Sequence, residues 1–147
     1  MNQVIVLSGA SGSGKSTFAK QLNGRIVSAD SYFMKNGAYQ FNPAELSNAH
    51  AHCFRMFIEH LQNKKEKVIV DNTNTTVEEI SPYMLGAAAY QYSASIITVQ
   101  STLNPQELSA RNLHGVGEKI ILAQLERIKN RKLPHYWKRE YYFNDRS

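Results

Sequence analysis

Short apolar runs alternate along the chain with longer stretches in which apolar residues recur at helical spacing. The short runs are rich in β-branched residues and predict buried strands over 3–8, 25–30, 67–74 and 95–100. The helical spacing predicts helices over 15–23, 43–62, from the third strand to about 92, 105–112 and 118–132. We expect the third of these helices to bend or restart at Ser81-Pro82, because proline lacks a backbone N–H.

Strands that alternate with helices predict a parallel sheet covered by helices on both faces. We therefore expect an α/β protein, a three-layer sandwich whose sheet has about four to five strands. Polar pairs end the first three strands: Ser8-Gly9, Asp30-Ser31 and Asp71-Asn72. Because ligands of such folds bind beyond the carboxyl ends of the strands, these side chains should meet at one edge.

The stretch GASGSGKS, residues 9–16, matches the P-loop pattern G-x-x-x-x-G-K-[ST]. Its glycines allow backbone N–H groups to turn inward around phosphate oxygens, and the next helix directs its N-terminal dipole at the same anion. Lys15 would reach the β- and γ-phosphates of ATP, and the Ser16 hydroxyl would bind Mg²⁺. The nucleotide-binding residues predicted in this way are Gly9, Ala10, Ser11, Gly12, Ser13, Gly14, Lys15, Ser16 and Thr17. The expected fold is thereby narrowed to that of a P-loop NTPase.

Two aspartates at the predicted edge of the sheet are candidates for the chemistry. Asp71 follows an apolar strand, where a P-loop protein places the acidic group that supports Mg²⁺; a turn cap is the structural alternative. Asp30 would face the γ-phosphate and accept the proton of an incoming hydroxyl. Its structural alternative is the N-cap of a short helix. We predict that Asp30 is the general base.

Length and composition are those of one P-loop domain over residues 1–147. The chain is 42% hydrophobic and 20% charged, and we find neither a signal peptide nor an apolar run that would span a membrane. Cys53 is the single cysteine, which excludes an internal disulfide and suits the reducing cytoplasm. The sequence indicates no obligate protein partner and leaves the oligomeric state open.

The net charge of +5 is concentrated near the C-terminus. Residues 1–110 hold 8 basic and 8 acidic groups, whereas residues 111–147 hold 9 basic and 4 acidic groups. A basic face there could meet ATP phosphates or a nucleic-acid backbone, or it could be a solvated helix surface. The tail over 133–147 mixes basic and aromatic residues, which suits nucleic-acid binding; an edge strand or a packed tail is equally compatible.

Five stretches together resemble the polynucleotide-kinase-like P-loop proteins: GASGSGKST, SADSYF, AYQFNPAELSNAHAH, VIVDNTNTT and ARNLHGVGEKI. The resemblance covers roughly residues 3–128. Members of this family transfer the γ-phosphate of ATP to the 5′-hydroxyl of DNA or RNA, a step of nucleic-acid repair. The resemblance implies such a kinase, using ATP and Mg²⁺, with Lys15, Ser16, Asp30 and Asp71 in the roles given above.

The resemblance also implies a C-terminal helical lid, over about 105–132, that carries an arginine. Arginine suits this role because its planar guanidinium group donates several hydrogen bonds to the transferring phosphate. Arg111 and Arg127 are both candidates, and the sequence leaves the choice open. His114-Gly115 is expected to turn the chain between the two lid helices.

The acceptor is where the chain departs from the family. Members often carry an arginine three residues after the base, where it binds a phosphate of the acceptor; Phe33 occupies that position here. Tyr32 and Phe33 could stack a base or pack in the core. A kinase of a nucleoside, modified base or other small alcohol is therefore an alternative. A non-catalytic ATP-binding regulatory protein is a second one, although such a protein has no need of Asp30.

Overall fold

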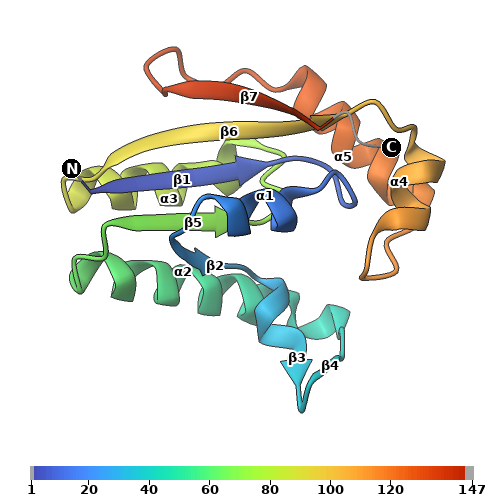
Figure 1. The fold of residues 1–147 in the computed structure, drawn as a ribbon, viewed down its shortest axis with the longest axis horizontal. Coiled ribbons are helices and arrows are strands. Elements are labelled where there is room, and N and C mark those ends of the chain that lie inside the picture. Colours follow the sequence, from blue (N-terminus) through green and yellow to red (C-terminus); the bar gives the residue numbers. More distant parts are fainter. Residues whose placement is uncertain (1, 145–147) are drawn as a thin grey trace.

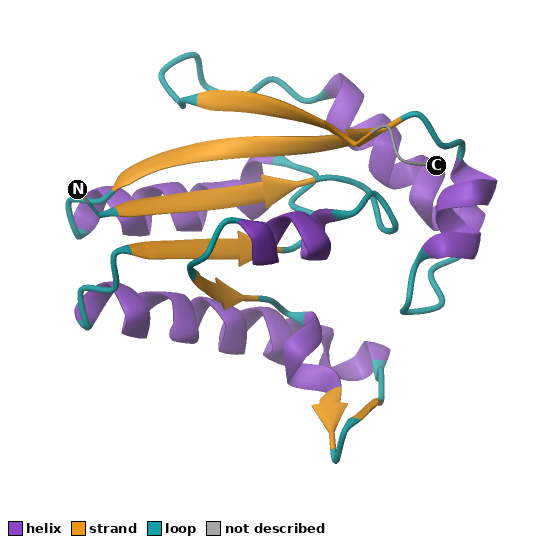
Figure 2. Ribbon diagram, viewed as in Figure 1, coloured by secondary structure: helices purple, strands orange, loops and turns teal. Residues whose placement is uncertain are grey.

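A computed structural model describes residues 2–144 of the chain. Its main feature is a five-stranded sheet in which every neighbouring pair is parallel (Figures 1 and 2). In spatial order the strands are β2 (Arg25–Val27), β5 (Lys67–Asp71), β1 (Gln3–Ser8), β6 (Ser93–Ser101) and β7 (Arg139–Asn144). The central position of β1 places the loop that follows it in the middle of the carboxyl edge.

Helices cover both faces of the sheet, as the alternating pattern predicted. Helix α1 (Lys15–Gln21) packs on one face, against the side chains of Ile5 and Leu7. Helices α2 (Leu46–Gln62) and α3 (Val77–Ala89) pack on the other, against Val4 and Val6. Neighbouring residues of β1 therefore serve opposite layers, because side chains alternate along a strand. The three-layer α/β class is confirmed.

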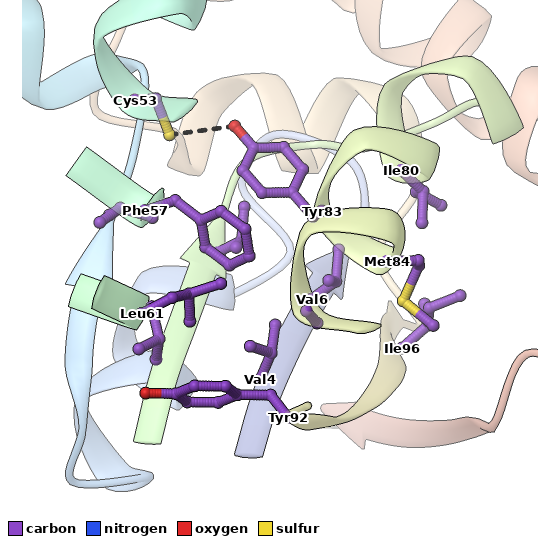
Figure 3. Close-up of a cluster of buried hydrophobic side chains, with 14 residues drawn as sticks. Val4, Val6, Cys53, Phe57, Leu61, Ile80, Tyr83, Met84, Tyr92 and Ile96 are labelled. Atoms are coloured by element: carbon purple, nitrogen blue, oxygen red, sulfur yellow. Dashed lines mark hydrogen bonds between the residues drawn. The ribbon is translucent and has the colours of Figure 1, made fainter. Parts of the chain in front are cut away.

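The larger core cluster lies between the sheet and the helices α2 and α3 (Figure 3). Phe57 and Ile80 are fully buried in it and supply the contacts between these helices and the sheet. The Tyr83 hydroxyl donates a hydrogen bond to Sγ of Cys53 at 3.3 Å. The single cysteine is thus a buried, unpaired thiol.

Helices α4 (Pro105–Arg111) and α5 (Glu118–Asn130) form a pair beyond the carboxyl ends of the strands (Figure 1). Leu108 and Ile121, one from each helix, pack on Ala10 of the loop after β1. The predicted lid region consequently lies directly against the predicted phosphate loop.

A small hairpin extends from the opposite end of the same edge. It consists of β3 (Met34–Lys35) and β4 (Ala38–Tyr39), which follow a 3-10 helix over Asp30–Phe33. Phe33 is only 2% exposed and packs with Ala29 and Ala49. Core packing, rather than base stacking, is therefore the role of Phe33.

Several predicted boundaries were wrong. The second strand ends at Val27 rather than residue 30, because the Ala29 N–H donates to Oδ1 of Asn72 at 2.8 Å instead of a strand partner. The third ends at Asp71, since Asn74 has a left-handed φ of 44°. The helix predicted over 43–62 opens with a 3-10 turn, Pro43–Glu45, and α3 continues through Pro82 without a restart.

The C-terminal tail forms an edge strand over Arg139–Asn144, which was one of the alternatives; residues 145–147 of the predicted tail lie outside the described residues. In the part of the chain that the structure describes, the helices are all too short or too polar to cross a bilayer.

Candidate active site

The loop between β1 and α1 has the left-handed glycine conformations that a phosphate-binding loop requires. Gly12 and Gly14 have φ values of 83° and 99°, which residues other than glycine rarely adopt. Helix α1 begins after Gly14, which as a glycine supplies no side-chain cap. The first N–H groups of α1 therefore have no intrahelical acceptor and are available to an anion.

Distant elements hold this loop in place. From α5, the side chain of Gln124 accepts from the Ser11 N–H at 2.9 Å and donates to the Ser11 hydroxyl at 3.2 Å. From the end of β7, the Asn144 amide donates to the Ser13 carbonyl at 2.9 Å. Neither Gln124 nor Asn144 was a predicted site residue, because no local sequence signal reports contacts over such separations. These hydrogen bonds fix the position of the loop relative to α5 and β7.

The Lys15 ammonium group lies inside the loop. It is 8% exposed and donates to the Ala10 carbonyl at 3.0 Å. Burial lowers its pKa to about 8, although the negative charges of Asp71 and Asp30 act in the opposite direction. A buried cation of this kind is costly unless an anion joins it, and a phosphate group satisfies that need.

The buried hydroxyl group of Ser13 lies near the Lys15 side chain. Among the described residues the Ser13 hydroxyl is buried and has no hydrogen-bond partner. A Cβ atom added to Gly9 would lie 3.0 Å from this hydroxyl and 3.5 Å from the Lys15 side chain, so the hydroxyl is inside the loop. Buried N–H, hydroxyl and ammonium groups together form a donor set that fits the oxygens of a polyphosphate.

Ser16 and Asp71 meet at the mouth of the loop. The Ser16 hydroxyl donates to Oδ2 of Asp71 at 2.9 Å. Burial raises the pKa of Asp71, while the Lys15 charge and the Ser16 hydrogen bond lower it. Two adjacent oxygen ligands suit Mg²⁺, which usually completes its shell with water and phosphate oxygens. Residues 2–144 contain no cluster of three or more His, Cys, Asp or Glu that could hold a metal without such ligands.

Asp30 lies at the same edge of the sheet, on the first residue of the 3-10 helix rather than on a strand. Its negative charge interacts with Lys15 and opposes the burial that lowers the pKa of that group. The side chain is 54% exposed, which leaves it accessible to a substrate. The Tyr39 hydroxyl donates to Oδ1 of Asp30 at 3.2 Å. Burial, followed by the charge of Asp30 and this hydrogen bond, raises the pKa of Tyr39 to about 12.

The two candidate lid arginines lie in different places. A Cβ atom at Gly14 would lie 3.8 Å from the Arg111 guanidinium group, which is therefore beside the phosphate loop. Arg127 instead donates through Nε to the Thr75 hydroxyl at 2.9 Å, near the start of α3. A third arginine, Arg131, bridges three chain segments by donating to Ser8 Oγ at 2.7 Å, Asn74 O at 2.9 Å and Thr98 Oγ1 at 3.0 Å.

The turn between α4 and α5 is built around Asn112. Its side-chain oxygen accepts from the N–H groups of His114 and Val116 at 3.1 and 3.0 Å, and its amide donates to the Ser109 and Val116 carbonyls. The turn itself was predicted, but the contact that its histidine makes with Asp30 was not. Nε2 of His114 lies 3.4 Å from Oδ2 of Asp30, across the mouth of the site.

Known proteins resemble this chain in sequence and in fold. The human protein NEDD4-binding protein 2 is 35% identical to the chain over an alignment of 130 residues, which covers 84% of this chain and 7% of that protein. The chain thus spans a small part of the length of that relative. A chain of the Pnkp1/Rnl/Hen1 RNA repair complex superposes with a TM-score of 0.67 and 21% identity, covering 87% of this chain and 44% of that one.

A second solved structure is the APS kinase CysC of Mycobacterium tuberculosis in complex with AMPPNP and APS. It superposes with a TM-score of 0.56 and 16% identity, covering 99% of this chain and 90% of that one. At this level of identity the likeness shows the fold, which is that of P-loop kinases and implies nucleotide binding.

The family comparison covers the site as well as the scaffold. A family model described as an AAA domain matches residues 4–133, a range that contains the phosphate loop, both aspartates and both lid helices. The kinase-like P-loop fold expected from the sequence is confirmed, and the chain belongs to the AAA domain family.

Proposed function

We propose that this protein transfers the γ-phosphate of ATP to a hydroxyl group, with Asp30 as the general base. The observation that carries the proposal is the placement of Asp30 just past the end of β2, at the same edge of the sheet as Lys15 and the phosphate loop. The charges of Asp30 and Lys15 interact there. A nucleotide-binding protein without transfer activity would gain nothing from a half-exposed carboxylate there. The transferase class follows from the pairing of a phosphate site with a base.

The residues divide the chemistry among them. The amides of the loop and the Lys15 ammonium group hold the phosphates and stabilise charge on the oxygens of the transferring group. Asp30 orients the acceptor hydroxyl and takes up its proton as the new P–O bond forms. Ser16 and Asp71 would hold Mg²⁺, which, when bound, neutralises charge on the β- and γ-phosphates.

We propose a nucleic-acid 5′ end as the acceptor. The C-terminal basic groups support this choice, as does the fold shared with a chain of an RNA repair complex. A nucleoside or another small alcohol is the second candidate, because the APS kinase shares the fold and Phe33 supplies no phosphate-binding cation.

The free thiol of Cys53 supports a reducing location such as the cytoplasm. We also propose that residues 1–147 work as one domain.

Incubation with γ-labelled ATP and a panel of 5′-hydroxyl DNA, 5′-hydroxyl RNA and nucleosides tests the proposal. We expect label on the polynucleotides, with an apparent affinity that falls steeply as salt rises, because bound phosphates release counterions. Label on nucleosides alone, insensitive to salt, would favour the second candidate. If no acceptor is labelled although ATP binds, the chain is a non-catalytic ATP-binding protein and the proposal fails.

For the lid arginine we propose Arg111, since its guanidinium group is the one beside the phosphate loop. Arg111→Ala should lower kcat by on the order of 10³-fold, the lower range for an arginine that stabilises a transferring phosphate. Arg127→Ala serves as the matched comparison and should retain most activity. Steady-state kinetics of both variants decide the choice, and a larger loss in Arg127→Ala would reverse it.

A further inference from the structure

Aromatic rings lie beside the carboxylate of Asp30. The Tyr39 ring is 4.2 Å from the imidazole of His114 and 6.3 Å from the ring of Phe41, to which it is nearly parallel at 7°. Phe41 is 49% exposed. Aromatic rings next to the general base Asp30 can stack on the planar ring of an acceptor such as a nucleobase.

These rings come from opposite sides of the site. Tyr39 belongs to the hairpin that follows Asp30, and His114 belongs to the turn between α4 and α5 (Figure 1). The two residues lie far apart in the sequence, yet their rings are in contact beside the carboxylate of Asp30. The contact therefore joins the lid region to the acceptor side of the site.

The backbone of the turn is fixed without help from the imidazole of His114. Asn112 and Ser109 supply the hydrogen bonds that close it, and Gly115 adopts the left-handed φ of 70° that it requires. The His114 side chain is instead directed at Asp30 and Tyr39. The His114 side chain therefore contributes to the candidate active site rather than to the structure of the turn.

The imidazole makes two contacts that a nucleoside acceptor would also make. One is a ring-on-ring contact with Tyr39, and the other is a polar atom against Oδ2 of Asp30. We propose that Tyr39 and His114 form a clasp over the acceptor site, in which His114 takes the place of the acceptor. The terminal base of an entering strand stacks on Tyr39 and displaces the imidazole, while its hydroxyl replaces Nε2 at Asp30.

This clasp rests on the proposed function and deepens it by naming the acceptor as one that bears a nucleobase. The hydroxyl of Tyr39 has a separate task, because it orients the carboxylate through Oδ1. The ring and the hydroxyl of Tyr39 can therefore be tested independently. Tyr39→Leu removes both, whereas Tyr39→Phe removes the hydroxyl and keeps the stacking face.

The experiment compares two 5′-hydroxyl oligonucleotides that differ only in their terminal nucleotide, which is intact in one and abasic in the other. Wild-type protein should show a KM roughly tenfold or more lower for the intact acceptor, the contribution of one stacked base. Tyr39→Leu should lose this preference, and Tyr39→Phe should keep it. Tyr90→Leu, which changes an exposed tyrosine at the end of α3, is the matched control and should behave as wild type.

His114→Ala provides the second readout and tests the clasp even if Tyr39→Leu does not fold. It should lower the KM for the intact acceptor severalfold without a loss of kcat, because the competing imidazole is gone. A fall in kcat at constant KM, or a wild type with no preference for the intact base, would overturn the clasp while leaving the proposed kinase in place. If neither acceptor is phosphorylated, the proposed function fails, and equal equilibrium binding of adenosine to wild type and Tyr39→Leu would then reject the clasp as well.

Discussion

Lys15→Met should strongly reduce the rate of phosphoryl transfer and leave the folded protein at least as stable as wild type at pH 7. The loss of rate should be about 10²- to 10³-fold or more, the effect of removing one group that stabilises charge in a transition state. Stability should not fall in parallel, because burial in the wild-type protein makes the charged form of Lys15 unfavourable. Loss of the hydrogen bond to Ala10 opposes this gain only in part.

The same substitution has a defined pH signature. Lys15 has a pKa of about 8 in the folded protein against 10.5 when unfolded, so between these values the unfolded chain binds more protons and wild-type stability rises with pH. The free-energy cost of burying the charged Lys15 side chain is fully present below pH 8. It amounts to about 3 kcal/mol at 1.36 kcal/mol per pKa unit. The stability advantage of Lys15→Met should therefore shrink between pH 8 and 10.5.

Urea unfolding of wild type and Lys15→Met at a series of pH values measures this difference. Lys20→Met, on the exposed side of α1, is the control and should show neither the loss of transfer nor the pH effect. A Lys15→Met protein that is less stable than wild type by the same amount at every pH would mean that Lys15 serves the fold and not a bound anion.

Asp30→Asn should reduce kcat by roughly 10²- to 10⁴-fold, the usual contribution of a general base. The change preserves the size of the side chain, and its amide oxygen can still accept the hydrogen bond from Tyr39. ATP affinity should stay within a fewfold of wild type, because the phosphates are held by the loop and Lys15. Single-turnover transfer from labelled ATP, together with equilibrium binding of ATP, separates the two effects.

The control for Asp30→Asn is Glu66→Gln, which neutralises an exposed acid before β5 and should leave transfer unchanged. Asp30→Asn that transfers at the wild-type rate would remove Asp30 from the mechanism. If transfer and ATP binding instead fell together, Asp30 would belong to the nucleotide site rather than to the acceptor side.

The sequence was sufficient for the scaffold and the phosphate loop because both depend on local signals. The alternation of Val4, Ile5, Val6 and Leu7 between two helix layers reflects the two-residue repeat of a strand. The loop is specified by eight consecutive residues, 9–16, whose glycines permit left-handed backbone. Neither inference needed knowledge of which distant segments meet.

Contacts between distant segments were beyond the sequence. Asn144 reaches the Ser13 carbonyl only because β7 pairs with β6 as a parallel edge strand. The approach of His114 to Asp30 depends on how α4 and α5 pack against the loop. The sequence left Phe33 with two possible roles, base stacking and core packing, because the exposure of a side chain depends on tertiary packing. In the structure Phe33 packs in the core with Ala29 and Ala49.

The most direct test of the account is a crystal structure of the protein with a non-hydrolysable ATP analogue, Mg²⁺ and a 5′-hydroxyl oligonucleotide. We predict the terminal phosphate at the Lys15 ammonium group and the acceptor hydroxyl within hydrogen-bonding distance of the Asp30 carboxylate, about 2.6–3.2 Å. A terminal phosphate bound in the loop with the acceptor on another face, away from Asp30, would contradict the account.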